Sequence, residues 1–128
     1  MPSQATLRPV QQVARWVALV LFVFLCLAYL NSAVFSAWVS DGPPNPYPLG
    51  WSRRALGHLS FSFAALLFGL ALFIGISQAP KIKKTPLVLL AVGFCFVVAP
   101  YAGRFILEDK CLDSGGSWSE DAIQCSNE

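Results

Sequence analysis

Charged residues are scarce in this sequence. Only 12% of its 128 residues are charged and 55% are hydrophobic, whereas about 25% of the residues of a soluble domain are charged. Three stretches, 16–40, 55–80 and 85–103, contain no acidic or basic residue apart from the single histidine, His58. A soluble fold of this size cannot cover three helices that are apolar on every face, so the composition argues against a water-soluble domain.

The residues that carry catalysis are equally scarce. There is one histidine, no acidic residue in the three uncharged stretches, and no Cys-x-x-Cys pair of the kind used by thiol oxidoreductases. Cys26 and Cys95 lie in apolar stretches, where free cysteine behaves as a small hydrophobic side chain. The basic residues are scattered, which argues against a nucleic-acid partner. We therefore expect no enzymatic activity, no metal site and no cofactor.

The uncharged stretches predict three membrane-spanning helices. About 20 apolar residues of helix cross a hydrocarbon core roughly 30 Å thick, and the shortest stretch, 85–103, has 19 residues. We predict an all-α membrane protein, a three-helix bundle of one domain in the lipid bilayer. Its predicted parts are helices at about 15–39, 55–78 and 86–107, an outer loop at 40–54, an inner loop at 79–85 and a tail at 108–128.

The first apolar stretch has a second interpretation as a cleaved signal peptide. The residues from Ser32 to Ala37 include the small side chains that a cleavage site needs. The stretch is, however, much longer than the apolar core of 7 to 15 residues in a signal peptide. We favour an uncleaved anchor.

The flanking charges predict the orientation. Basic residues concentrate in cytoplasmic loops. With the amino terminus inside, five basic residues are cytoplasmic: Arg8, Arg15, Lys81, Lys83 and Lys84. Four lie on the other side: Arg53, Arg54, Arg104 and Lys110. We predict a bacterial inner-membrane protein with a cytoplasmic amino terminus and a periplasmic carboxyl terminus.

Small residues at four-residue spacing predict helix-packing faces. In lipid, helices associate through close packing, which small side chains permit. One such stripe lies in the first predicted helix: Ala28, Ser32 and Ser36. Another lies in the third: Ala91, Cys95, Ala99 and Gly103. The stripes fit either contacts within a tight three-helix bundle or contacts with a helix of another protein.

The outer loop is rich in proline, with Pro43, Pro44, Pro46 and Pro48 in six positions. These prolines predict an extended polyproline segment in place of helix. Two interface-type aromatic residues, Tyr47 and Trp51, lie in the same region. The segment is interpreted either as a stiff connector on the headgroups or as a recognition loop.

The tail contains Cys111 and Cys125, which predict a disulfide in an oxidising compartment such as the periplasm. Gly115 and Gly116 permit a tight turn with positive φ, and Trp118 is expected to cover the disulfide or rest on the membrane. We expect Arg104 to pair within its helix, four or five residues on, with Glu108 or Asp109. Arg53 and Arg54 are expected to meet the acidic tail.

The tail carries a resemblance. Its pattern, Cys111-x-Asp113-x-Gly115-Gly116-x-Trp118 with a closing Cys125, resembles a cystine motif of small exported or membrane-anchored bacterial proteins. Some of those proteins look like immunity proteins, which protect a cell from toxins of its own kind. The three-span outline is also similar to membrane immunity proteins of pore-forming toxins, although a shared outline does not fix function.

Two functions follow as hypotheses. The first is a non-enzymatic protein that binds another protein, in its concrete form an immunity protein that neutralises a bacterial toxin at the membrane. The second is an accessory subunit of a larger membrane complex, such as a transporter or respiratory assembly. The residues predicted to contact the partner are Pro43, Pro44, Tyr47, Trp51, Arg53, Arg54, Asp113 and Trp118.

Overall fold

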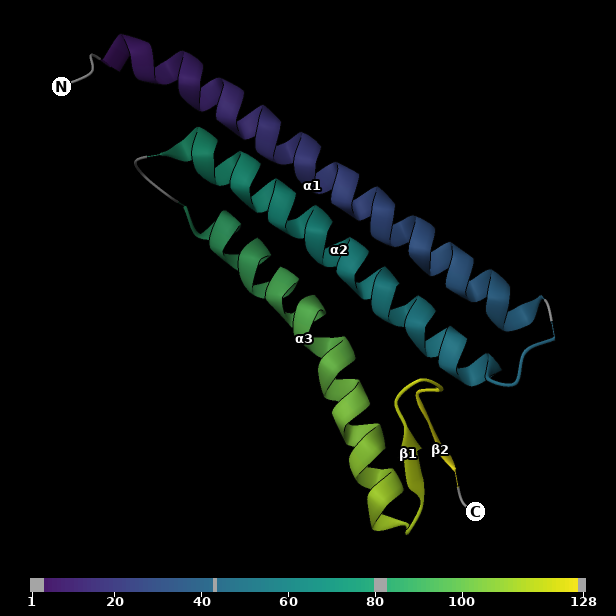
Figure 1. Ribbon diagram of the computed structural model, residues 1–128. Coiled ribbons are helices and arrows are strands. Elements are labelled where there is room, and N and C mark those ends of the chain that lie inside the picture. The colour runs from purple at the N-terminus through teal and green to yellow at the C-terminus, as the bar shows by residue number, and fades with distance from the viewer. Residues whose placement is uncertain (1–3, 43, 80–82, 127–128) are drawn as a thin grey trace.

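Three long helices and a small carboxyl-terminal hairpin make up the structure. It is a computed structural model, and it describes residues 4–42, 44–79 and 83–126. The elements are α1 (Gln4–Asp41), α2 (Pro48–Gln78), α3 (Lys84–Asp113), β1 (Ser117–Ser119) and β2 (Gln124–Ser126). Figure 1 shows α2 between α1 and α3, with the hairpin at the end of the molecule far from the amino terminus. The predicted all-α membrane fold, with three spanning helices and a disulfide-closed tail, is confirmed.

The distribution of side chains fits lipid as the solvent. Large apolar side chains lie on the surface: Phe24 is 72% exposed and Phe105 is 70% exposed. The residues buried within the helical region are small, and those of α2 are Gly50, Ser62, Ala64, Ala65, Gly69 and Ala71. Water would penalise so much exposed apolar surface, whereas hydrocarbon does not. The chain is thus a multi-pass membrane protein.

α1 and α2 pack closely along much of their length. A Cβ atom added to Gly69 of α2 would lie only 2.7 Å from the Cβ of Phe22 in α1, so the approach requires glycine. Further towards the hairpin, the Ser62 hydroxyl of α2 donates to the Cys26 carbonyl oxygen at 2.9 Å. In the other direction, Trp16 meets Phe73 edge-on with ring centroids 5.1 Å apart. Small residues, aromatic contacts and interhelical hydrogen bonds therefore join this pair, and Gln11 Nε2 of α1 adds a second such bond to the Ile76 carbonyl oxygen of α2.

The predicted stripe on α1 only partly coincides with this contact face. Ser36 is buried at 3% exposure and Ser32 is half-buried, but Ala28 is exposed. The hydroxyl of Ser36 donates to the Ser32 carbonyl oxygen of its own helix. Ala33, 6% exposed, belongs to the buried face although it lies outside the stripe. An α-helix has about 3.6 residues per turn, so residues spaced exactly four apart move gradually around the helix and leave the contact face.

The predicted stripe on α3 does not pack within the chain. Its four residues are exposed: Ala91, Cys95, Ala99 and Gly103. Gly93, two positions along, is the buried residue, and an added Cβ there would lie 2.8 Å from the Phe68 ring of α2. The interpretation of the stripe as a contact inside the bundle is wrong, because α3 turns a neighbouring face to α2. Contact with a helix of another protein stays a prediction.

The proline-rich loop is shorter than predicted. α2 begins at Pro48, so Trp51, Arg53 and Arg54 belong to this helix and not to the loop. Proline suits the first position of a helix, because the amide that it lacks has no partner there. Pro43, one of the predicted contact residues, lies outside the described residues.

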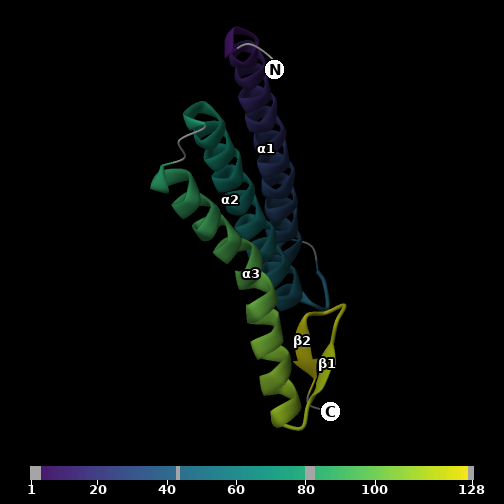
Figure 2. The ribbon, with the colours of Figure 1, turned by 90° about the vertical axis from the view of Figure 1, so that its left-hand side faces the viewer.

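α3 is longer than predicted and leaves α2 part of the way along. It continues past residue 107 to Asp113 and passes through Pro100. In Figure 1 its first half runs beside α2 and its second half diverges, and the bend of α3 is also visible in Figure 2. Because proline removes one backbone hydrogen bond and crowds the preceding turn, it accounts for such a bend. The hairpin folds back from the end of α3 towards the beginning of α2.

Candidate functional site

The hairpin end of the molecule is the candidate functional site. We use "hairpin end" for residues 44–47, the first turns of α2 from Pro48 to His58, the part of α3 after Pro100, and the tail. It contains every described residue that the sequence predicts to contact a partner. It also contains most of the polar contacts between different elements.

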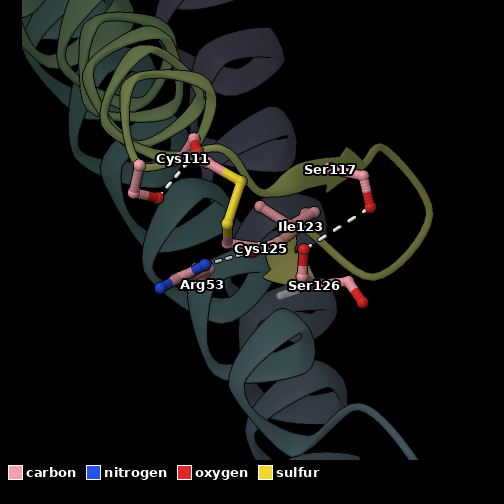
Figure 3. The surroundings of a disulfide bond; sticks show 7 residues. Arg53, Cys111, Ser117, Ile123, Cys125 and Ser126 are labelled. Atoms are coloured by element: carbon pink, nitrogen blue, oxygen red, sulfur yellow. Dashed lines mark hydrogen bonds between the residues drawn. A yellow bond between two sulfur atoms is a disulfide. The ribbon is translucent and has the colours of Figure 1, made fainter. Parts of the chain in front are cut away.

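The hairpin is short and covalently fixed. β1 and β2 pair antiparallel, with Trp118 opposite Cys125, and a disulfide joins Cys125 to Cys111 in the last turn of α3 (Figure 3). The chain leaves α3 through Gly115, whose φ of 77° confirms the predicted glycine turn. A hairpin this small is marginal alone, so its attachment to a helix supplies order that the strands lack.

Close backbone packing holds the hairpin against α2. Ala122, in the loop between the strands, is only 1% exposed. A Cβ atom added to Gly50 would overlap the carbonyl oxygen of Ala122, so any other residue at this position would push the hairpin away. No sequence signal identified this pair, since a single glycine near a helix start and a single alanine in a polar loop are both unremarkable.

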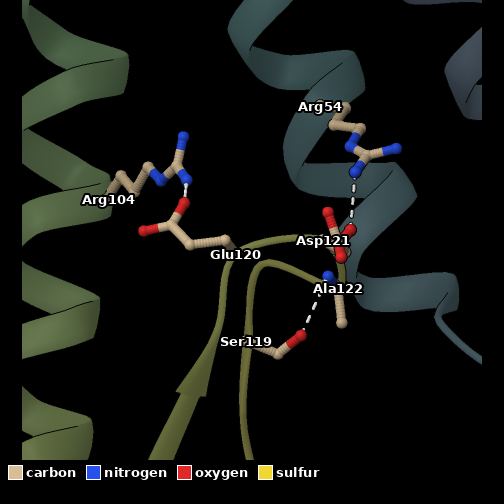
Figure 4. Close-up of polar contacts among 6 residues, drawn as sticks. All are labelled: Arg54, Arg104, Ser119, Glu120, Asp121 and Ala122. Atoms are coloured by element: carbon tan, nitrogen blue, oxygen red, sulfur yellow. Dashed lines mark hydrogen bonds and ion pairs between the residues drawn. The ribbon is translucent and has the colours of Figure 1, made fainter.

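Two arginines of α2 fasten the same loop. Arg53 donates to the Ile123 carbonyl oxygen (Figure 3), and Arg54 donates to the Asp121 carbonyl oxygen at 2.5 Å (Figure 4). The prediction that both arginines meet the tail is confirmed. The acceptors are backbone carbonyls, however, and not the acidic side chains, which leaves the positive charges of both guanidinium groups uncompensated by these bonds.

Arg104 of α3 pairs with the tail as well. It forms an ion pair with Glu120 of the hairpin loop (Figure 4). The prediction of a partner one turn along the same helix, Glu108 or Asp109, is wrong, because the hairpin folds back beside α3 and brings Glu120 within reach. The two side chains are 42% and 61% exposed, so the pair contributes only about 0 to 1 kcal/mol.

The other predicted contact residues divide into two groups. Pro44, Tyr47 and Asp113 are exposed and available to a partner. Trp51 and Trp118 are half-buried and make internal contacts. The Arg54 guanidinium lies 4.9 Å from the centroid of the Trp51 ring, and the Trp118 backbone is paired with the disulfide-bonded Cys125.

His58 lies near this end, within α2. Its ring stacks on Tyr29 of α1 with centroids 6.2 Å apart. Its Nδ1 atom is buried and has no hydrogen-bond partner among the described residues. Within residues 4–42, 44–79 and 83–126, no group of three or more histidine, cysteine or acidic side chains is placed to hold a metal ion.

The chemistry assembled here is that of attachment and recognition: guanidinium donors, exposed aromatic and proline side chains, and a cross-linked hairpin. No known protein family, curated protein or solved structure matches the chain.

Proposed function

We propose that this protein is a non-enzymatic membrane protein that binds another protein through its hairpin end. The observation that carries the proposal is that the tail is a fixed surface. The Cys111–Cys125 disulfide holds the hairpin to α3, and Arg53 and Arg54 hold it to α2. A surface fixed before binding loses little conformational entropy when a partner docks, so it suits recognition.

The proposal includes a compartment and an orientation. The chain lies in a bacterial inner membrane, with the amino terminus in the cytoplasm and the hairpin end in the periplasm. Along the sequence, five basic residues flank the spans on the amino-terminal side and four on the hairpin side, and this excess supports the orientation. The disulfide supports it too, since such bonds persist in oxidising compartments.

The concrete form of the proposal is immunity against a membrane-active or periplasmically delivered toxin. The protein then acts by occupancy: the hairpin end covers the toxin's functional surface, and no covalent step is needed. The resemblance of the Cys111–Cys125 segment to the tails of small exported bacterial proteins supports this choice. The exposed Pro44, Tyr47 and Asp113 are the side chains that such a toxin would contact.

Toxin challenge of a deletion strain tests this function. Cells without the gene should die under attack by the cognate toxin, and the wild-type gene should restore survival. The double substitution Tyr47→Ala with Asp113→Ala should not restore it, whereas a control substitution at the opposite end, Arg8→Gln, should. Full survival of the deletion strain under attack would argue decisively against an immunity function.

A second candidate function, an accessory subunit of a membrane complex, rests on a different observation. The small-residue stripe of α3 is exposed along the helix and has room for a neighbouring helix. Purification in mild detergent should then recover partner subunits in fixed stoichiometry. Ala91→Leu with Ala99→Leu should release them, because large side chains prevent close approach, while Phe94→Leu, at an exposed position on another face of the helix, should not.

A further inference from the structure

A cavity of about 550 Å³ lies between α2 and α3 at the hairpin end. It occurs where α3 has diverged from α2 beyond Pro100, and Ile123 of the hairpin loop contributes to its wall. Figure 1 shows this divergence, with the hairpin between the two helices. The cavity is partly open to the surroundings.

Its polar wall is cationic. Arg53 and Arg54 of α2 and Arg104 of α3 all line the cavity, and no described lining residue is acidic. The first two donate only to neutral carbonyl oxygens, so their charges stay available to an anion. Arg104 is paired with Glu120, but both side chains are substantially exposed, and a guanidinium group has five N–H donors.

Its remaining wall is largely apolar. Leu56 and Phe61 line it from α2, and Pro100 and Leu107 line it from α3. The ring of His58 lies between the two kinds of wall, and its buried Nδ1 atom has no partner in the described part of the chain.

The cavity lies at the border between the lipid bilayer and water. Arg53 and Arg54 directly precede the uncharged stretch 55–80, and Arg104 directly follows the uncharged stretch 85–103. The cations are consequently at the level of the lipid headgroups, while the apolar wall faces the acyl chains. A ligand that fits this wall has an anionic head and an apolar body.

We propose that the cavity binds an anionic phospholipid of the leaflet at the hairpin end. Its phosphate accepts hydrogen bonds from Arg54 and Arg104, and its acyl chains lie along Leu56, Phe61 and Pro100. Guanidinium groups bind phosphate with paired hydrogen bonds. The three arginines of the wall favour an anionic headgroup over a zwitterionic one, because they repel the cation that a zwitterionic headgroup carries. The cavity wall does not include Pro44, Tyr47 or Asp113, the exposed residues that the proposed toxin contacts.

Lipid binding by the purified, full-length protein tests the proposal. Native mass spectrometry in mild detergent should show phosphatidylglycerol bound at roughly tenfold lower concentration than phosphatidylcholine, the shift expected from about one additional charge-assisted interaction. Inorganic phosphate at millimolar concentration should not displace the lipid, because it lacks the apolar body. Equal binding of the two lipids, or displacement by phosphate alone, overturns the proposal.

Three variants are expected to weaken, preserve and strengthen lipid binding, which separates an effect on binding from misfolding. Arg54→Gln with Arg104→Gln should weaken phosphatidylglycerol binding roughly tenfold, whereas Lys110→Gln, a cation of α3 outside the cavity wall, should leave it unchanged. Glu120→Gln should strengthen binding several-fold, because it removes the carboxylate that competes for Arg104. Wild-type binding by the double arginine variant, or no gain from Glu120→Gln, contradicts the proposed site.

A steric variant tests the apolar wall without changing any charge. Gly103 lines the cavity, and an added Cβ there meets no atom within 4 Å, so the helix tolerates a side chain at this position. Gly103→Leu should fill the space and reduce the bound fraction of phosphatidylglycerol at least fivefold. Unchanged binding by this variant shows that the lipid lies elsewhere and overturns the proposal.

Discussion

The pair of helices α1 and α2 and the hairpin end are held together by different interactions. Between the helices, the buried side chains are small, and hydrogen bonds run from Ser62 to the Cys26 backbone and from Gln11 to the Ile76 backbone. The hairpin end is held together by a disulfide, two arginine–carbonyl hydrogen bonds and one ion pair. The difference reflects the solvent of each region. Lipid gives no hydrophobic driving force between helices, so α1 and α2 associate through close packing of complementary surfaces. The short tail lies in water and has no hydrophobic core, so it needs cross-links.

This comparison predicts that the two regions can be destabilised separately. A substitution at the hairpin end should leave the α1–α2 interface intact, and a substitution at that interface should leave the hairpin ordered. Amide hydrogen exchange, resolved by region, measures both in one experiment.

The largest effect is expected from removal of the disulfide. Cys111→Ser with Cys125→Ser frees a loop with a sequence separation of 14 residues, which costs about 3 kcal/mol in the chain-entropy estimate. Amides of β1 and β2 should then exchange rapidly, while those of α1 and α2 stay protected. The matched control, Cys26→Ser, removes one of the two free cysteines and should not alter exchange in the hairpin. Continued protection of the strands in the double variant would show that the arginine contacts alone suffice.

The next largest loss of stability is expected at the interface between α1 and α2. Gly69→Ala places a Cβ atom 2.7 Å from that of Phe22, so the helices must move apart, at a cost of about 2 kcal/mol in the free energy of unfolding. The measurement is unfolding in mixed detergent micelles. Gly103→Ala is the control: its new methyl group meets nothing within 4 Å, and alanine favours helix by up to about 1 kcal/mol. A loss of stability in the control, or none in Gly69→Ala, would contradict the packing argument.

Much of the membrane region could be predicted from the sequence, because a long uncharged stretch has few alternatives to a spanning helix. The three helices, the disulfide and the glycine turn at Gly115 are confirmed. Helix ends were less predictable. Pro48 was interpreted as part of an extended loop, although proline is also a good first residue of a helix.

At the hairpin end, the meeting of Arg53 and Arg54 with the tail could be predicted, but the partner of Arg104 could not, because it depends on how the tail folds back. Spacing along α3 favours Glu108 as the partner of Arg104, yet the tertiary fold brings Glu120 there. Likewise, a stripe of small residues identifies a possible packing face without saying which face meets which helix, so Gly93 and not Cys95 is buried.

A smaller effect is expected where the hairpin docks on α2. Gly50→Ala overlaps the Ala122 carbonyl oxygen, so the hairpin should leave α2 and lose the bonds from Arg53 and Arg54. The disulfide still limits its freedom, so the cost is about 1 to 2 kcal/mol, the value of two such hydrogen bonds. Gly57→Ala is the control, since its methyl group would lie 3.8 Å from Pro100, an ordinary contact. The measurement is limited proteolysis of the tail, which should be faster in Gly50→Ala than in Gly57→Ala. Equal rates of cleavage in the two variants would contradict close docking of the hairpin on α2.

The smallest loss of stability is expected from removing a single interhelical hydrogen bond, either between α1 and α2 or between α2 and α3. Ser62 donates to the Cys26 carbonyl oxygen of α1 at 2.9 Å, and Ser60 donates to the Phe96 carbonyl oxygen of α3 at 2.6 Å. Each interhelical bond contributes about 0.6 kcal/mol in a membrane protein. Ser62 is 5% exposed, so Ser62→Ala should cost more than Ser60→Ala. Ser77→Ala removes only a bond to its own helix and should cost nothing measurable. The packed α1–α2 interface excludes other hydrogen-bond partners for the Cys26 carbonyl. Equal losses of stability from Ser62→Ala and Ser60→Ala would therefore mean that α3 packs against α2 as tightly as α1 does.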